Sequence, residues 1–165
     1  MHLSSYTDYA LRLLMYVAVR NDGLPTISEV AQAYGISKNH LMKVAHQLGL
    51  GGYLETVRGR NGGLRLGRPA DQIRIGDVIR YTEQDLAIVE CMAAPNGGPS
   101  ACRLSPACTL RTALREALEA FLAVLDGYTL EDIVHQRQSV ATLLGLPVPP
   151  PLPPPLPLPE SAGFP

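Results

Sequence analysis

Apolar residues recur at helical spacing near the start of the chain, between residues 5 and 20. With 3.6 residues per turn, such residues lie on one face of a helix. Ser5 and Asp8 have the spacing of a capping pair at its start, and Asn21 to Gly23 mark its end. On this helix Asp8 and Arg12 form an i, i+4 pair. The predicted apolar face consists of Ala10, Leu11, Leu14, Met15, Val17 and Ala18.

Two further helical patterns follow, joined by a short turn. Thr26 and Glu29 have the spacing of a capping box that opens a helix ending near Gly35, and Ser37 stands where the next helix has its N-cap. Two short helices joined by a turn of about three residues form a helix-turn-helix, whose second helix enters the major groove of DNA. An ordinary helical hairpin with a charged outer face is the alternative. The predicted inner face of the second helix is Leu41, Val44, Ala45 and Leu48.

An alternating pattern over residues 53–66 surrounds an Asn61-Gly62 pair and favours a β-hairpin. A hairpin directly after a helix-turn-helix is typical of a winged helix, whose wing tip meets the minor groove or the DNA backbone. The predicted DNA-binding residues are Ser28, Ser37, Lys38, Asn39, His40 and Lys43 on the helices, and Arg58, Arg60 and Asn61 on the wing.

In the second half of the chain, residues 75–90 read as a helix followed by a short extended or helical run into Cys91, and a long helix runs from Ser105 to Asp126. Apolar residues of the long helix are spaced 4, 3, 4 and 3 apart, as in a heptad seam. We expect a symmetric dimer in which two such helices cross, although the helix alternatively packs on its own domain. Thr129 caps a last short helix. The seam is Leu110, Leu114, Ala117, Phe121 and Val124, widened by Leu118, Leu122 and Leu125.

These elements predict a mainly α fold with a small β-hairpin. Residues 1–72 form a winged helix-turn-helix DNA-binding domain. Residues 73–135 hold a linker helix, a loop over 91–108 and the dimerisation helix. Residues 136–165 are expected to be a Pro-rich disordered tail, since nine of the thirteen residues from 147 to 159 are Pro.

Charge is distributed unevenly, although the net charge is only −1. Residues 38–68 carry six Lys or Arg and one acidic residue, which favours an anionic partner such as DNA. No apolar run approaches the length of a membrane span, and the N-terminus is not a signal peptide, so we expect a cytoplasmic protein without membrane contact. Nothing in the sequence resembles a nucleophile with a base and a substrate pocket, so we do not expect an enzyme.

All three cysteines fall in the loop over 91–108, at Cys91, Cys102 and Cys108. Three thiolates there would hold a metal or an iron–sulfur cluster and leave one coordination position for another group. A reversible disulfide with one thiol left over, or no chemistry at all, are the alternatives. Ser105-Pro106 reads as the start of a helix, which places Cys108 in the first turn, where the helix dipole favours a thiolate.

Three stretches of the chain together match one known family: LSSYTDYALRLLMYVA (3–18), ISEVAQAYGISKNHLMKVAHQLGLGGYLETVRGRNGGLRL (27–66) and ACRLSPACTLRTALREALEAFLAVLDGYTLEDI (101–133). On these residues the chain resembles the winged-helix iron–sulfur repressors of bacteria of the IscR/NsrR type, and within them the nitric-oxide-sensing branch. The resemblance implies a cytoplasmic bacterial homodimer that binds palindromic promoter DNA as the [4Fe–4S] form, with nitric oxide as effector.

The resemblance also implies the ligand set. Cys91, Cys102 and Cys108 of one subunit hold the cluster with Asp8 of the partner subunit, and Arg12 steadies that carboxylate. A [2Fe–2S] cluster is the alternative cofactor; the second branch of the family holds it with a His three residues after the third Cys, where this chain has Arg111. The gap between the first two cysteines is longer here than in the family.

Three alternative functions remain at this stage. One is a cluster-free, thiol- or metal-responsive regulator on the same winged helix, and another is a cluster regulator that senses iron or oxygen. The third is an interaction protein whose hairpin and long helix bind another protein, with the Pro-rich tail as a second contact.

Overall fold

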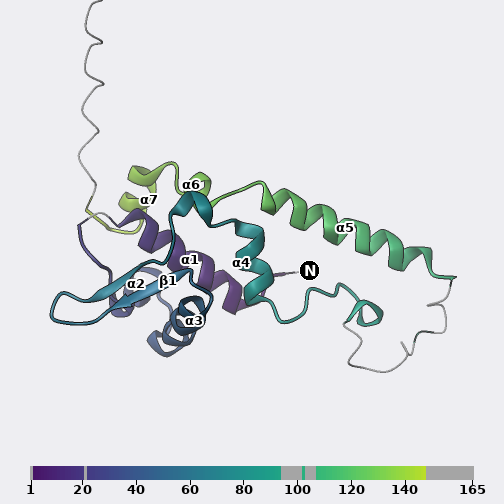
Figure 1. The fold of residues 1–165 in the computed structure, drawn as a ribbon, viewed down its shortest axis with the longest axis horizontal. Helices are drawn as coiled ribbons and strands as arrows, with labels where there is room; N and C mark the ends of the chain where they lie inside the picture. The colour runs from purple at the N-terminus through teal and green to yellow at the C-terminus, as the bar shows by residue number, and fades with distance from the viewer. Residues whose placement is uncertain (1, 21, 94–101, 103–106, 148–165) are drawn as a thin grey trace, which may run out of the picture.

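The computed structural model describes residues 2–20, 22–93, 102 and 107–147, and Figure 1 shows their arrangement. The fold is mainly helical with one two-stranded hairpin, as the sequence predicts. In chain order the elements are α1 (Ser5–Val19), α2 (Ile27–Tyr34), α3 (Lys38–Leu50), β1 (Leu54–Val57), β2 (Gly63–Leu66), η1 (Ala70–Gln72), α4 (Ile75–Thr82), η2 (Glu90–Met92), α5 (Thr109–Asp126), α6 (Leu130–Ile133) and α7 (Arg137–Leu143).

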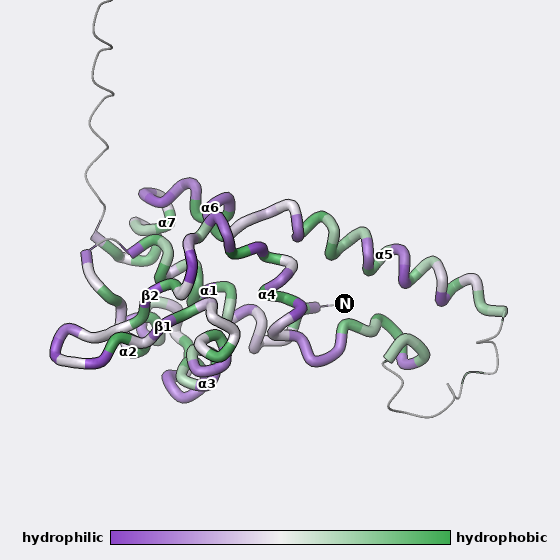
Figure 2. The backbone as a smooth tube through the Cα atoms, viewed as in Figure 1, coloured by the Kyte–Doolittle hydropathy of each residue, from purple (hydrophilic) through white to green (hydrophobic). Residues whose placement is uncertain are grey.

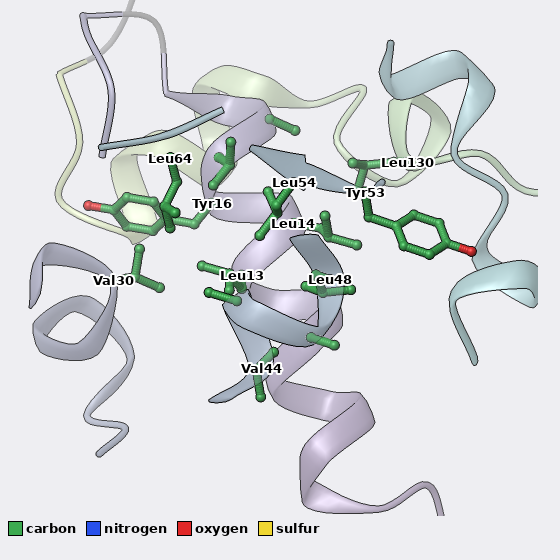
Figure 3. Packing of buried hydrophobic residues seen from close by; sticks show 14 of the residues in the cluster. Leu13, Leu14, Tyr16, Val30, Val44, Leu48, Tyr53, Leu54, Leu64 and Leu130 are labelled. Atoms are coloured by element: carbon green, nitrogen blue, oxygen red, sulfur yellow. The ribbon is translucent and has the colours of Figure 1, made fainter. Parts of the chain in front are cut away.

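Helix α1 lies at the centre of the fold, and α3, α4, β2, α6 and α7 pack around it (Figure 3). For this reason its buried surface extends beyond the single predicted face and includes Leu13 and Tyr16. The predicted cap at Ser5 is wrong by one residue. Ser4 is the N-cap, and its hydroxyl accepts a hydrogen bond from the backbone N–H of Thr7.

The helix-turn-helix forms from α2 and α3 as predicted. Thr26 and Glu29 make both hydrogen bonds of the capping box. Gly35 ends α2 with φ of 65°, a left-handed conformation that costs glycine little. Ser37 holds the N-cap position of α3, but its side chain makes no capping hydrogen bond. The predicted inner face is confirmed, since Leu41, Val44, Ala45 and Leu48 are buried.

The wing is the antiparallel pair β1 and β2, with Leu54 opposite Leu66 and Val57 opposite Gly63. Leu54 and Leu64 are buried against the core beside α1. The wing tip lies between the strands, where the backbone N–H of Gly62 donates to the carbonyl of Gly59. The predicted hairpin is therefore confirmed.

The predicted helix at the start of residues 75–90 is confirmed as α4, which ends at Thr82, and the run after it contains no α-helix. The predicted apolar side of α4, Ile75, Val78 and Ile79, is buried. Helix α5 ends at Asp126 as predicted but begins at Thr109, with Cys108 at its N-cap position. The predicted start at Ser105 and Pro106 lies outside the described residues.

Helix α5 extends away from the rest of the fold (Figure 1) and packs against α4 and η2. None of its residues is buried. Leu110 and Val124 keep 64% and 63% of their surface exposed. Figure 2 shows apolar positions recurring along the helix to its far end. Within the described residues the predicted seam is only partly covered, because Leu114 and Phe121 are half-buried and Leu110, Ala117 and Val124 are exposed.

The C-terminal helices return to α1 and complete its core. Thr129 and Asp132 form a capping box at the start of α6, as predicted. Helix α7 corrects the prediction of a tail beginning at residue 136, because Ala141 and Leu146 are buried in the same core as α1. Arg137 Nη1 donates to the carbonyl of Ala18 at 2.7 Å, near the end of α1. The Pro-rich stretch after residue 147 lies outside the described residues.

Candidate DNA interface and cysteine segment

The predicted DNA-binding residues lie on α2, α3 and the wing. All nine are exposed to solvent. The α3 residues occupy its first two turns, which face away from the buried side that holds Leu41 and Val44. The structure thus places on the surface the residues that the sequence singles out, which are Ser28, Ser37, Lys38, Asn39, His40, Lys43, Arg58, Arg60 and Asn61.

The cations of this surface differ from several other arginines, which pair with carboxylates. Arg65 pairs with Glu55 across the wing, and Arg80 pairs with Asp126. Within the described ranges, by contrast, none of the four predicted DNA-binding cations forms an ion pair. A cation without a carboxylate partner is available to a phosphate without the loss of an existing pair. These four cations are Lys38, Lys43, Arg58 and Arg60.

Helix α1 supports the first turns of α3 from below. The ring of Tyr9 stacks on His40, with centroids 6.3 Å apart and planes 27° from parallel. The hydroxyl of Tyr6 donates to the carbonyl of Lys43 at 3.4 Å. Both contacts come from the first two turns of α1, so that end of the helix fixes the part of α3 that carries the predicted DNA-binding residues.

Met42 is a candidate contact that the sequence analysis misses. It lies on α3 between Asn39 and Lys43, and 44% of its surface is exposed. A thioether on a polar face provides apolar contact, which in a major groove suits the methyl group of thymine. Its i+3 spacing from Asn39 is the signal in the sequence that places it on the outer face.

Asp8 and Arg12 form the predicted i, i+4 pair, with Arg12 Nε 2.9 Å from Asp8 Oδ1. Each side chain keeps 44% of its surface exposed. The Arg12 guanidinium also lies over the ring of Tyr34 on α2, 5.7 Å from its centroid. Burial raises the pKa of the Tyr34 hydroxyl, and the positive charge of Arg12 offsets part of this rise, so that the pKa is about 12. Arg12 therefore holds the Asp8 carboxylate in place while leaving it accessible.

The three cysteines are only partly characterised by the described residues. Cys91 lies in η2 and is partly buried, Cys102 is exposed, and Cys108 is partly buried at the N-cap of α5. In the described part of one subunit, no three His, Cys, Asp or Glu side chains gather as a metal site. The donor set nevertheless suits an iron–sulfur cluster, because thiolates are its usual ligands and Asp8 offers an accessible carboxylate.

None of the helices in the described ranges has the length and apolar character needed to cross a membrane.

Comparisons with known proteins agree with the winged-helix fold described above. Residues 3–136 match the Rrf2 family, described as an iron-dependent transcriptional regulator. The chain is 51% identical to the HTH-type transcriptional regulator NsrR of Bacillus licheniformis over 145 residues, which cover 87% of this chain and 99% of that protein. It is 50% identical to NsrR of Bacillus subtilis over 145 residues, with 87% of this chain and 97% of that protein covered.

Solved structures of transcriptional regulators show the same fold. CymR, the global cysteine regulator of B. subtilis, superposes with a TM-score of 0.65 at 25% identity, covering 82% of this chain and 98% of that chain. IscR of T. potens gives a TM-score of 0.66 at 21% identity, covering 85% and 90%. The relatives are transcriptional regulators, which confirms the expectation that the chain is not an enzyme.

Proposed function

The chain belongs to the Rrf2 family of transcriptional regulators, and from that premise we propose that it is a dimeric repressor of the bacterial cytoplasm. Its binding to palindromic promoter DNA is controlled by a [4Fe–4S] cluster that reacts with nitric oxide. The observation that carries this proposal is the exposed surface of α3 and the wing, with its four unpaired cations. Similarity to NsrR proteins supports the choice of cluster and effector.

The residues of α3 and the wing divide the work of binding DNA. Helix α3 enters the major groove by its first turns, where the Asn39 amide suits the edge of an adenine. Lys38 and Lys43 meet phosphate or guanine, and Arg58 and Arg60 reach the backbone or the minor groove from the wing tip. Phosphate contacts fix the register, and base contacts select the sequence.

A second copy of the chain covers the apolar stripe of α5. Within the described part of one chain the stripe is only partly covered, and its large apolar residues Leu110 and Val124 are exposed. A partly exposed apolar stripe at heptad spacing favours a helix–helix interface, and two-fold symmetry matches a palindromic site. The dimer then presents two copies of α3 to two half-sites.

The cluster's ligands would be the thiolates of Cys91, Cys102 and Cys108 and the carboxylate of Asp8 from the partner subunit. When bound, a cluster supplies iron that nitric oxide ligates. Within the chain, Arg12 holds the Asp8 carboxylate at the first turn of α1, and Tyr9 one residue later stacks on His40 of α3. The proposed ligand Asp8 is thus adjacent in sequence to Tyr9, which contacts α3, the helix proposed to enter the major groove (the reading helix).

The test is a visible spectrum of protein purified without air, with iron and sulfide counts, followed by titration with nitric oxide and a DNA-binding assay at each step. Loss of the cluster band together with DNA affinity supports the proposal. Cys102→Ala and Cys108→Ala are expected to lose iron and sulfide. Retained colour in both variants contradicts the ligand assignment. A colourless, iron-free wild-type protein that binds DNA points instead to the cluster-free regulator.

A further inference from the structure

The C-terminal end of α5 is fixed to α4 by a paired contact. Arg80 Nη1 lies 2.6 Å from Asp126 Oδ1, and Nη2 lies 2.7 Å from Oδ2. This is the bidentate geometry in which guanidinium and carboxylate planes align, so it constrains orientation as well as distance. A Cβ at Gly76 would overlap Asp126 Oδ1, so glycine there leaves room for the paired side chains of Asp126 and Arg80.

Backbone hydrogen bonds reinforce this attachment. The N–H of Ile75, the first residue of α4, donates to the carbonyl of Tyr128 at 2.9 Å, and the N–H of Leu130 donates to the carbonyl of Ile73 at 2.8 Å. The chain that follows the end of α5 is thus tied to the start of α4. Because the outer part of α5 projects away from the fold (Figure 1), its direction depends on this base.

Tyr81, the residue of α4 that follows Arg80, contacts α3. The Tyr81 hydroxyl donates to the carbonyl of Gln47 at 2.8 Å and accepts from Gln47 Nε2 at 3.0 Å. Gln47 stands in the last turn of α3, and its carbonyl also accepts a hydrogen bond from the backbone N–H of Gly51 at 3.0 Å. The Tyr81 hydroxyl adds a second hydrogen bond to that carbonyl and also contacts the Gln47 side chain, so α4 is bonded to the C-terminal end of α3.

The wing secures the same end of α3. Arg68 Nη2 donates to the carbonyl of Gly51 at 2.7 Å, and Arg68 Nε donates to that of Gly52 at 3.1 Å. The Arg68 guanidinium lies 4.5 Å from the ring centroid of Tyr53, and that ring packs against the ring of Tyr81 at 5.4 Å. The end of α3, the base of the wing and α4 therefore form one continuous set of contacts.

We infer that α4 is a strut that transmits the position of α5 to the reading helix, with Arg80 contacting Asp126 and Tyr81 contacting Gln47. Figure 1 shows α4 between α5 and the helix-turn-helix. Adjacent residues on a helix point about 100° apart, so one turn of α4 serves both contacts. The inference rests on the proposed function, because it concerns a dimer that reads two half-sites at a fixed separation. Arg80 and Tyr81 are positioning residues and need not touch DNA.

The experiment uses full-length protein purified without air and a palindromic duplex that the wild-type protein selects from a random-sequence library. Affinity is measured for this duplex, for the same duplex with one half-site scrambled, and for duplexes with one base pair added or removed between half-sites. The variants are Tyr81→Phe, Asp126→Asn and both together. Arg115→Gln is the matched control, since Arg115 and Glu119 lie 3.9 Å apart on α5, at 63% and 70% exposure, away from the strut. Thermal melting verifies that each variant is folded.

We expect Tyr81→Phe and Asp126→Asn to weaken binding to the palindrome about fivefold, the effect of losing roughly one hydrogen bond. Half-site affinity stays within about twofold, and the preference for the selected spacing falls. The double variant is no weaker than the weaker single variant, because both changes interrupt the same connection. Arg115→Gln behaves as wild type.

Equal losses on the palindrome and the half-site overturn the inference, because Tyr81 then only stabilises α3 within its own subunit. Unchanged affinity and spacing preference in both single variants overturn it too. A wild-type protein that is monomeric, or that selects no palindrome, refutes the proposed dimer and the strut together. That result appears before any variant is made, so the two failures are distinguishable.

Discussion

Replacing Arg60 by Gln tests whether the wing tip contacts the DNA backbone. Arg60 is exposed, and within the described part of the chain it has no carboxylate partner. Lys38, Lys43 and Arg58 are likewise exposed and without a carboxylate partner in the described part of the chain. The proposed dimer carries two copies of each of these four cations. Each phosphate that a protein cation neutralises releases counterions and contributes about 0.9 to the slope of log affinity against log salt.

The magnitude follows from this set of cations. If all four contact phosphate in each subunit, the slope is about −7, and Arg60→Gln, which removes one contact per subunit, changes it to about −5. Between about 50 and 200 mM salt, the affinity of the wild type then falls about 10⁴-fold and that of the variant about 10³-fold. The effect of the substitution is largest at low salt.

The assay is fluorescence anisotropy with the selected palindromic duplex over this range of salt. The matched control is Glu55→Gln combined with Arg65→Gln, also on the wing. This pair already neutralises itself, with Arg65 Nη2 2.5 Å from Glu55 Oε2, and the double change keeps the net charge. The control should leave the slope unchanged. A slope in Arg60→Gln equal to that of the wild type refutes the assignment of Arg60 to phosphate contact.

Three other predictions concern the dimer, base reading and acid stability. Leu110→Glu places a charge on the exposed stripe of α5, so sedimentation should show a monomer, and a persistent dimer would exclude this stripe as the interface. Replacing half-site thymines by uracil removes only their methyl groups. This change should weaken DNA binding severalfold in the wild type but not in Met42→Ala. Equal effects in both proteins would exclude Met42 as the residue that contacts the thymine methyl group. The backbone N–H of Thr26 donates to the Glu29 carboxylate and holds its pKa below the usual 4.5. The ionised carboxylate therefore stabilises the fold above pH 4.5. This contribution is lost as the pH falls through the lower pKa that Glu29 has in the folded protein. Glu29→Gln should therefore flatten the decline of Tm between about pH 5 and 3, and an unchanged profile would contradict the assignment.

Local patterns predict most of the fold, because capping boxes and hairpins are decided by residues close in sequence. Thr26 with Glu29 and Thr129 with Asp132 form as expected. What local patterns leave open or miss depends on distant residues. The pattern over residues 75–90 does not fix where its helix ends. In the structure α4 ends at Thr82, whose hydroxyl accepts a hydrogen bond from Thr7 Oγ1 of α1 at 2.9 Å. Helix α7 was missed because its stability depends on burial against α1.

The candidate site shows the same division. The exposed cations of α3 and the wing follow from helical periodicity and from the composition of the turn, which a sequence displays directly. The contacts of Arg68 with the end of α3 and of Arg80 with Asp126 join residues 17 and 46 positions apart, and no periodicity indicates such pairs. The cysteine ligand set stays a prediction, since the described residues do not gather into a metal site and most of the segment between Cys91 and Cys108 lies outside them.

The position of the last buried residues has a consequence for biosynthesis. The carbonyl of Ala18 receives its hydrogen bond from a residue 119 positions later, and Leu146 belongs to the same core. While only the winged-helix segment of a nascent chain has emerged from the ribosome, part of the packing around α1 is therefore missing. Folding that waits for the C-terminus also means that prematurely terminated products have an incomplete core. Such fragments are expected to be degraded rather than to occupy promoter sites as monomers.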